Sequence, residues 1–77
     1  MRTFHEIACE ICKEWAKVSP SALPYLAAMF EIFSSDKNAA YGYDSADSIV
    51  RYFLANAGSW RGDAARRIKA ELKAMIA

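Results

Sequence analysis

The sequence predicts an all-α protein, a compact single-domain bundle of about four short helices that takes up residues 1–77. Apolar residues recur at three- and four-residue spacing in four separate segments, which is the periodicity of an amphipathic helix. Residues that cap helices precede these segments, and no window of four to eight residues alternates between apolar and polar as a half-buried strand does. A chain of 77 residues has room for one hydrophobic core, and its 55% hydrophobic composition is enough to fill it.

The first helix is expected to begin after Thr3 and to end near Lys17. Thr3 and Glu6 fit a capping box, in which each side chain accepts a hydrogen bond from the backbone amide of the other residue. The apolar residues that follow fall on one face of the helix, which should be the buried one. They are Phe4, Ile7, Ala8, Ile11, Cys12 and Trp15.

The second helix is expected to begin at a Ser21 cap, with Pro24 in its first turn, and to run to about Phe33. It is apolar on both sides, with Glu31 as its only charge, and such a helix is either central in the fold or covered by a partner. We expect the stripe of Leu23, Leu26, Ala27, Phe30 and Phe33 to be buried. The other side carries Tyr25, Ala28, Met29 and Ile32.

The third helix should be capped by Asp44, with Asp47 in its first turn, and should end at Gly58 in a left-handed conformation. Ser59 can then cap a fourth helix. The two buried stripes are Ala46, Ile49, Val50, Phe53, Leu54 and Ala57 in the third helix and Ala64, Ala65, Ile68, Leu72, Met75 and Ile76 in the fourth. The expected core holds Trp15, Phe30, Phe53 and Leu72.

Composition excludes several classes of protein. No apolar stretch reaches the roughly 18 residues that span a bilayer, so no membrane contact is expected. Arg2 and Glu6 interrupt any secretory signal, and Cys9 and Cys12 lie too close together to link distant segments. These observations predict a cytoplasmic protein with reduced thiols.

No catalytic constellation is present, so we expect neither an enzyme nor a cofactor. The only histidine is His5, and the three glycines stand singly, which leaves no phosphate-binding loop. His5, Cys9 and Cys12 lie on one edge of the first helix, but a structural zinc site takes four ligands. We therefore predict no metal, and keep a metal or redox protein at these three residues as the second alternative.

The leading hypothesis is a small protein-binding module or a small homo-oligomer. Tyrosines offer apolar area with a polar group and are favoured at protein interfaces. The tyrosines at 41 and 43 could instead fold back and seal the core. The predicted partner-binding residues are Tyr25, Met29, Ile32, Tyr41, Tyr43 and Tyr52.

Charge supplies the first alternative, a nucleic-acid-binding protein. The formal net charge is +1, but residues 60–77 carry five basic and two acidic side chains, whereas residues 1–59 carry five basic and seven acidic ones. A basic last helix could contact phosphates, although the residues around Gly58 do not fit a helix-turn-helix. The basic residues proposed for phosphate contact are Arg61, Arg66, Lys69 and Lys73.

The C-terminal half also resembles known sequences. The stretch from Tyr41 to Ile76, YGYDSADSIVRYFLANAGSWRGDAARRIKAELKAMI, is similar to small, uncharacterised proteins encoded by phages, prophages and other mobile elements. The resemblance brings no catalytic residues with it. It implies a protein that acts by binding host machinery, such as a defence complex.

Overall fold

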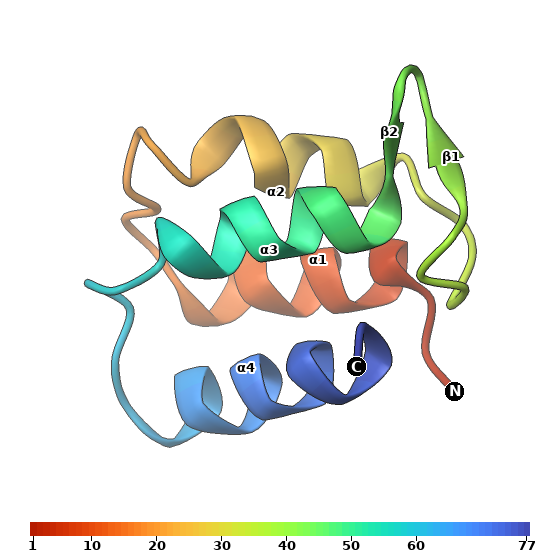
Figure 1. The fold of residues 1–77 in the computed structure, drawn as a ribbon. Helices are drawn as coiled ribbons and strands as arrows, with labels where there is room; N and C mark the ends of the chain where they lie inside the picture. The colour runs from red at the N-terminus through yellow and green to blue at the C-terminus, as the bar shows by residue number, and fades with distance from the viewer.

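The computed structural model describes residues 1–77 as four helices and one short β-hairpin (Figure 1). The protein is therefore mostly helical, but the prediction of a purely all-α bundle was wrong because it missed the hairpin. In chain order the elements are α1 (Phe4–Glu14), α2 (Leu23–Phe30), β1 (Ala40–Tyr41), β2 (Asp44–Ser45), α3 (Ala46–Ala55) and α4 (Asp63–Met75).

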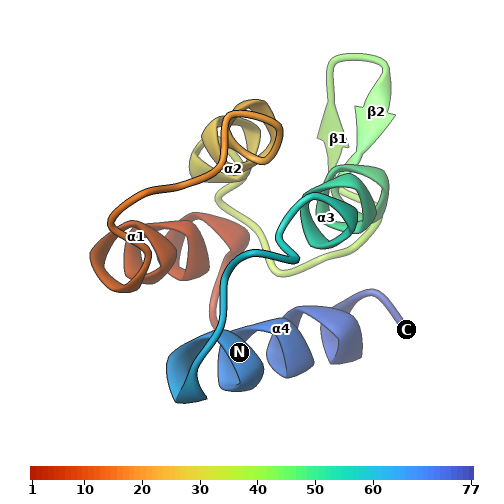
Figure 2. The same cartoon turned by 90° about the vertical axis from the view of Figure 1, so that its left-hand side faces the viewer.

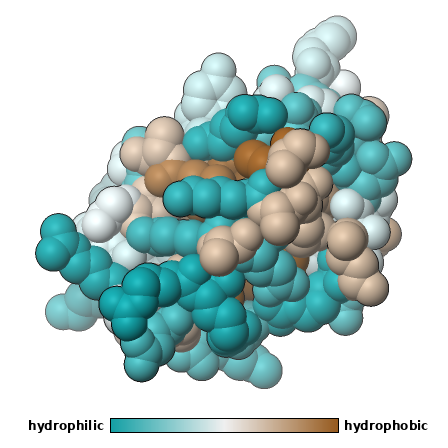
Figure 3. All heavy atoms as spheres, turned by 60° about the horizontal axis from the view of Figure 1, so that its bottom comes forward, coloured by the Kyte–Doolittle hydropathy of each residue, from teal (hydrophilic) through white to brown (hydrophobic).

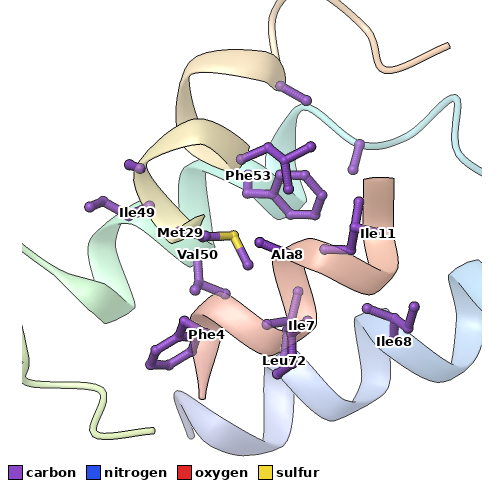
Figure 4. Packing of buried hydrophobic residues seen from close by; sticks show 14 of the residues in the cluster. Phe4, Ile7, Ala8, Ile11, Met29, Ile49, Val50, Phe53, Ile68 and Leu72 are labelled. Carbon is purple, nitrogen blue, oxygen red and sulfur yellow. The ribbon is translucent and has the colours of Figure 1, made fainter. Parts of the chain in front are cut away.

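Seen end-on, the four helices surround one core, with α2 above α1 and α3 and with α4 below them (Figure 2). Helix α2 packs against both α1 and α3, and α4 packs against α1. A single cluster of 21 buried residues fills the space between the helices. Met29 of α2 points into it beside Val50 and Phe53 of α3, while Ile68 and Leu72 of α4 enter from below (Figure 4).

Helix α1 confirms the predicted start. The Glu6 amide donates to the Thr3 hydroxyl at 3.1 Å, and the Thr3 amide donates to the Glu6 carboxylate at 2.9 Å. The helix ends at Glu14, earlier than expected, and Trp15 packs in the core against Trp60 with a ring separation of 5.4 Å. Cys12, which was expected on the buried face, is exposed.

Helix α2 is buried mainly on the side that was expected to face outward, although Leu26 of the predicted stripe is buried as well. Met29 and Ile32, which were expected on an outer surface, lie in the core, whereas Leu23 and Phe33 are exposed. Phe30 is only half-buried. Because both sides are apolar, the periodicity could not identify which of them packs against α1 and α3. Pro24 lies in the first turn as predicted, but the N-cap is Ala22 and not Ser21.

The hairpin was missed because each strand has only two residues, too few to show an alternating pattern. Ala40 pairs with Ser45 and Tyr41 pairs with Asp44, and Gly42 makes the turn with a φ of 61°. Asp44 therefore belongs to a strand and is not the cap of α3. The N-cap is Ser45, which donates a hydrogen bond from its hydroxyl to the carboxylate of Asp47.

The connection between α3 and α4 also differs from the prediction. Helix α3 is capped at its C-terminus by Asn56, and Gly58 does not have a positive φ. The positive φ, 111°, occurs at Gly62, which takes the N-cap position of α4 in place of Ser59. The intervening Trp60 is buried, so the linker is anchored to the core and the chain turns after it. None of the helices has both the length and the apolar character needed to cross a membrane.

Candidate protein-binding surface

Large apolar side chains remain exposed on and around α2. Apart from the terminal Met1, the exposed ones are Leu23 (52%), Phe33 (72%), Tyr43 and Tyr52 (56%). Leu23, Ala27 and Phe30 follow one another at four- and three-residue spacing along the outer side of α2. We call the following set the α2 surface: Leu23, Tyr25, Ala27, Phe30, Phe33 and Tyr52.

Two predicted tyrosines meet where α2 contacts α3. Tyr25 of α2 and Tyr52 of α3 stack with a ring separation of 5.4 Å and an interplanar angle of 20°. Tyr25 is half-buried against the core, whereas Tyr52 is exposed. The ring of Tyr52 is therefore held in place from one side and open to a partner on the other.

The two tyrosines of the hairpin have different environments. The Tyr41 hydroxyl donates to the Glu31 carboxylate at 2.6 Å, and the ring packs against the core. This hydrogen bond to Glu31 raises the pKa of Tyr41. Tyr43, at the hairpin tip, is fully exposed. The prediction that these residues seal the core thus describes Tyr41, while Tyr43 is available to a partner.

Helix α4 uses part of its basic character within the fold. The Lys69 ammonium donates to the carbonyls of Ala57 and Trp60, each at 2.7 Å, and desolvation lowers the pKa of Lys69. Arg66 pairs with Asp63 on the same helix. Only Arg61 and Lys73 of the four predicted phosphate-contacting residues are exposed and form no ion pair.

The face of the molecule that carries α4 is mostly hydrophilic, with narrow strips of apolar side chains between the polar ones (Figure 3). Acidic side chains lie among the basic ones, because Arg67 pairs with Glu10 at 2.5 Å and Arg2 pairs with Glu10 and Glu71, both at 2.6 Å. These pairs reduce the positive field that a phosphate backbone would meet.

An open depression over α1 holds two of the three predicted metal and redox residues. It is lined by His5 and Cys9 among mostly charged side chains. Cys12 lies outside it, and no three of the chain's His, Cys, Asp and Glu side chains come together as a metal site. The pKa of Cys12 is raised by desolvation and then by Cys9, opposite to the lowered pKa of a redox-active thiol.

Comparison with known proteins assigns no relative, since no protein-family model, curated protein or solved structure matches this chain. The fold and surface define the class at a coarser level. It is a small, mostly helical domain with an apolar α2 surface on one side and a charged α4 on the other. Leu23 and Phe33 were missed as surface residues because they lay in the stripe expected to be buried.

Proposed function

We propose that this protein is a small protein-binding module and that it binds through the α2 surface. The observation that supports the proposal is the exposure of Leu23 on the one helix that carries no charge, together with the exposure of Phe33 after that helix and of Tyr52 on α3. Neighbouring exposed apolar residues mark interaction sites in soluble proteins. The resemblance of residues 41–76 to phage-encoded proteins makes a host protein complex the expected partner.

The α2 surface has the properties of an interface centre. Leu23 and Phe33 supply apolar area, and burial of such area stabilises a complex by about 25 cal/mol per Å². Tyr52 is already stacked on Tyr25, so less side-chain entropy is lost when a partner covers it. A partner with an apolar, uncharged face would therefore fit this surface best.

Nucleic-acid binding is the less favoured function. Lys69 donates two of its three ammonium hydrogens to backbone carbonyls, and Arg66 is paired with Asp63. Phosphate binding would therefore depend on Arg61 and Lys73, together with whatever contacts Arg66 could exchange. Two free cations would give a shallow dependence of affinity on salt.

The test begins by isolating a partner from the host by pull-down and measuring its affinity by calorimetry. A Leu23→Asp/Tyr52→Ala double variant should weaken binding by at least about 30-fold, because interface anchors contribute about 2 kcal/mol or more. Both side chains are exposed, and an acidic residue suits the first turn of a helix, so the fold should survive.

Two controls make this test specific. Ala70→Asp places the same new charge on the exposed side of α4 and should leave the affinity unchanged. Arg61→Glu/Lys73→Glu should also leave it close to the wild-type value. If the charge reversals abolish binding and the Leu23→Asp/Tyr52→Ala variant binds normally, the partner is recognised by the basic helix and the proposal is wrong.

A further inference from the structure

The side chains of His5 and Cys9 are in contact and have the spacing of two zinc ligands. His5 Nε2 lies 3.6 Å from Cys9 Sγ. In a tetrahedral zinc site, with Zn–N near 2.0 Å and Zn–S near 2.3 Å, nitrogen and sulfur ligands are separated by about 3.6 Å. The two atoms therefore need little movement to bind one zinc ion. Their positions follow from helix geometry, since residues four apart lie on the same face of α1.

The imidazole of His5 is oriented for this role by residues at the end of α2. Its Nδ1 lies 2.6 Å from the backbone oxygen of Phe30, and because a carbonyl can only accept, the proton is on Nδ1. Nε2 is then the unprotonated nitrogen and faces the thiol of Cys9. The ring also stacks on Phe33 with a centroid separation of 4.3 Å. A hydrogen bond from the non-ligating nitrogen to a carbonyl is the usual support of a zinc-bound histidine.

The neighbouring carboxylates do not complete a site within one chain. Glu6 accepts the hydrogen bond of the Thr3 amide, and Glu10 is paired with Arg2 and Arg67. No third ligand joins His5 and Cys9, whereas structural zinc takes four. The pair lines an open depression at the protein surface, so ligands from another molecule can reach it.

We propose that His5 and Cys9 form half of a tetrahedral zinc site and that a second copy of this chain completes it. A two-fold axis through the ion would bring the same two ligands from each copy, giving two nitrogens and two sulfurs. On binding, each Cys9 thiol loses its proton to the solvent and each His5 keeps the proton on Nδ1. Phe30 and Phe33, which orient His5, also belong to the α2 surface, but Leu23 and Tyr52 form no interaction with His5 or Cys9. The variants at Leu23 and Tyr52 therefore test the proposed α2 interface separately from this site.

Sedimentation of the reduced protein, first with a chelator and then with added zinc, tests the proposal. The expected result is a shift from monomer to dimer that saturates at about one zinc per two chains. Cobalt in place of zinc should give the thiolate charge-transfer band and the intense visible bands of a tetrahedral ion. A mass that does not respond to zinc would overturn the proposal.

Three variants test which residues hold the ion. Cys9→Ser removes the thiolate, and His5→Asn removes Nε2 while its amide can still donate to the Phe30 carbonyl. Both should remain monomeric at the zinc concentration that saturates the wild type, with circular dichroism as the check on folding. Cys12→Ser is the matched control and should dimerise normally. Zinc-dependent dimerisation by Cys9→Ser, or its loss in Cys12→Ser alone, would contradict the assignment.

Discussion

Helices α2 and α4 lie on opposite sides of the bundle and differ in the chemistry of their outer surfaces (Figures 1 and 2). Each buries one stripe in the shared core. The other side of α4 carries charged side chains, whereas α2 has no charged residue and leaves Leu23 exposed. A solvated face on α4 needs no partner, and the uncovered apolar side of α2 is where we propose that one binds.

The two helices are also held by different interactions. Besides its packing, α4 is tied to α1 and to the N-terminal segment by ion pairs that join Arg67 to Glu10 and Arg2 to both Glu10 and Glu71. Helix α2 forms no ion pair and is held to its neighbours by apolar packing and by the hydrogen bond from His5 Nδ1 to the Phe30 carbonyl. Salt and acid should therefore loosen the contact of α4 before that of α2.

The largest effect is expected from the buried side of α2. Met29→Ala should lower the free energy of unfolding by about 2–5 kcal/mol, because Met29 is completely buried and its truncation leaves a cavity. Leu23→Ala, on the exposed side, should change it by less than about 1 kcal/mol. Urea denaturation measures both. Equal losses would mean that α2 is buried on both sides and that the contrast with α4 is wrong.

The next effect concerns the two glycines before α4, of which only Gly62 has a positive φ. Gly62 has a φ of 111° and a ψ of −179°, a region that only glycine adopts readily, so Gly62→Ala should cost about 1–3 kcal/mol. No atom lies within 4 Å of the added methyl group at either Gly62 or Gly58, so sterics do not separate the two positions. Gly58 lacks a positive φ, and Gly58→Ala should therefore be neutral or slightly stabilising. The same thermal or urea melt compares them, and equal costs would contradict the backbone assignment.

A smaller effect is expected from the ammonium that links α4 to the preceding turn. Lys69→Met keeps an apolar side chain but removes the ammonium that lies 5.9 Å from the centre of the Trp60 ring and leaves the carbonyls of Ala57 and Trp60 without this donor, which should cost about 1–2 kcal/mol. Lys73→Met, on an exposed side chain of the same helix, is the control and should have little effect. If both variants unfold at the wild-type urea concentration, the hydrogen bonds of Lys69 contribute nothing measurable.

The smallest effect is the acid response of the contact between α1 and α4. Hydrogen bonds from Arg67 and Arg2 lower the pKa of Glu10, so its stabilisation is complete above the unfolded-state value near 4.3 and is lost as the pH falls through the lowered value. Glu10→Gln should cost less than about 1 kcal/mol at pH 7. Between about pH 5 and about pH 2 it should lose less stability than the wild type. Parallel pH curves for the two proteins would show that these ion pairs do not stabilise the fold.

The spacing of apolar residues predicted the buried side correctly in the helices that carry charged residues on one side and apolar residues on the other. The capping box at Thr3 and the buried stripes through Ile7, Val50 and Ile68 follow from neighbours three and four residues apart, and all are present in the structure. Among the site residues, Tyr25, Tyr43 and Tyr52 have exposed or half-buried rings, but Met29 and Ile32 are in the core. That error came from the one segment in which both faces have the same chemistry.

The sequence by itself determined four helical segments, one core and which side of α1, α3 and α4 is buried, because these features depend on residues close together in the chain. Only the tertiary structure decided which side of α2 is covered, since that choice depends on contacts with α1 and α3. It also decided that Gly62, and not Gly58, takes the positive φ, because Trp60 is held against Trp15 and the chain turns only after it. The pairing of His5 with Cys9 combines both levels: their spacing of four residues puts them on one face, and the carbonyl of Phe30, 25 residues from His5, orients the ring.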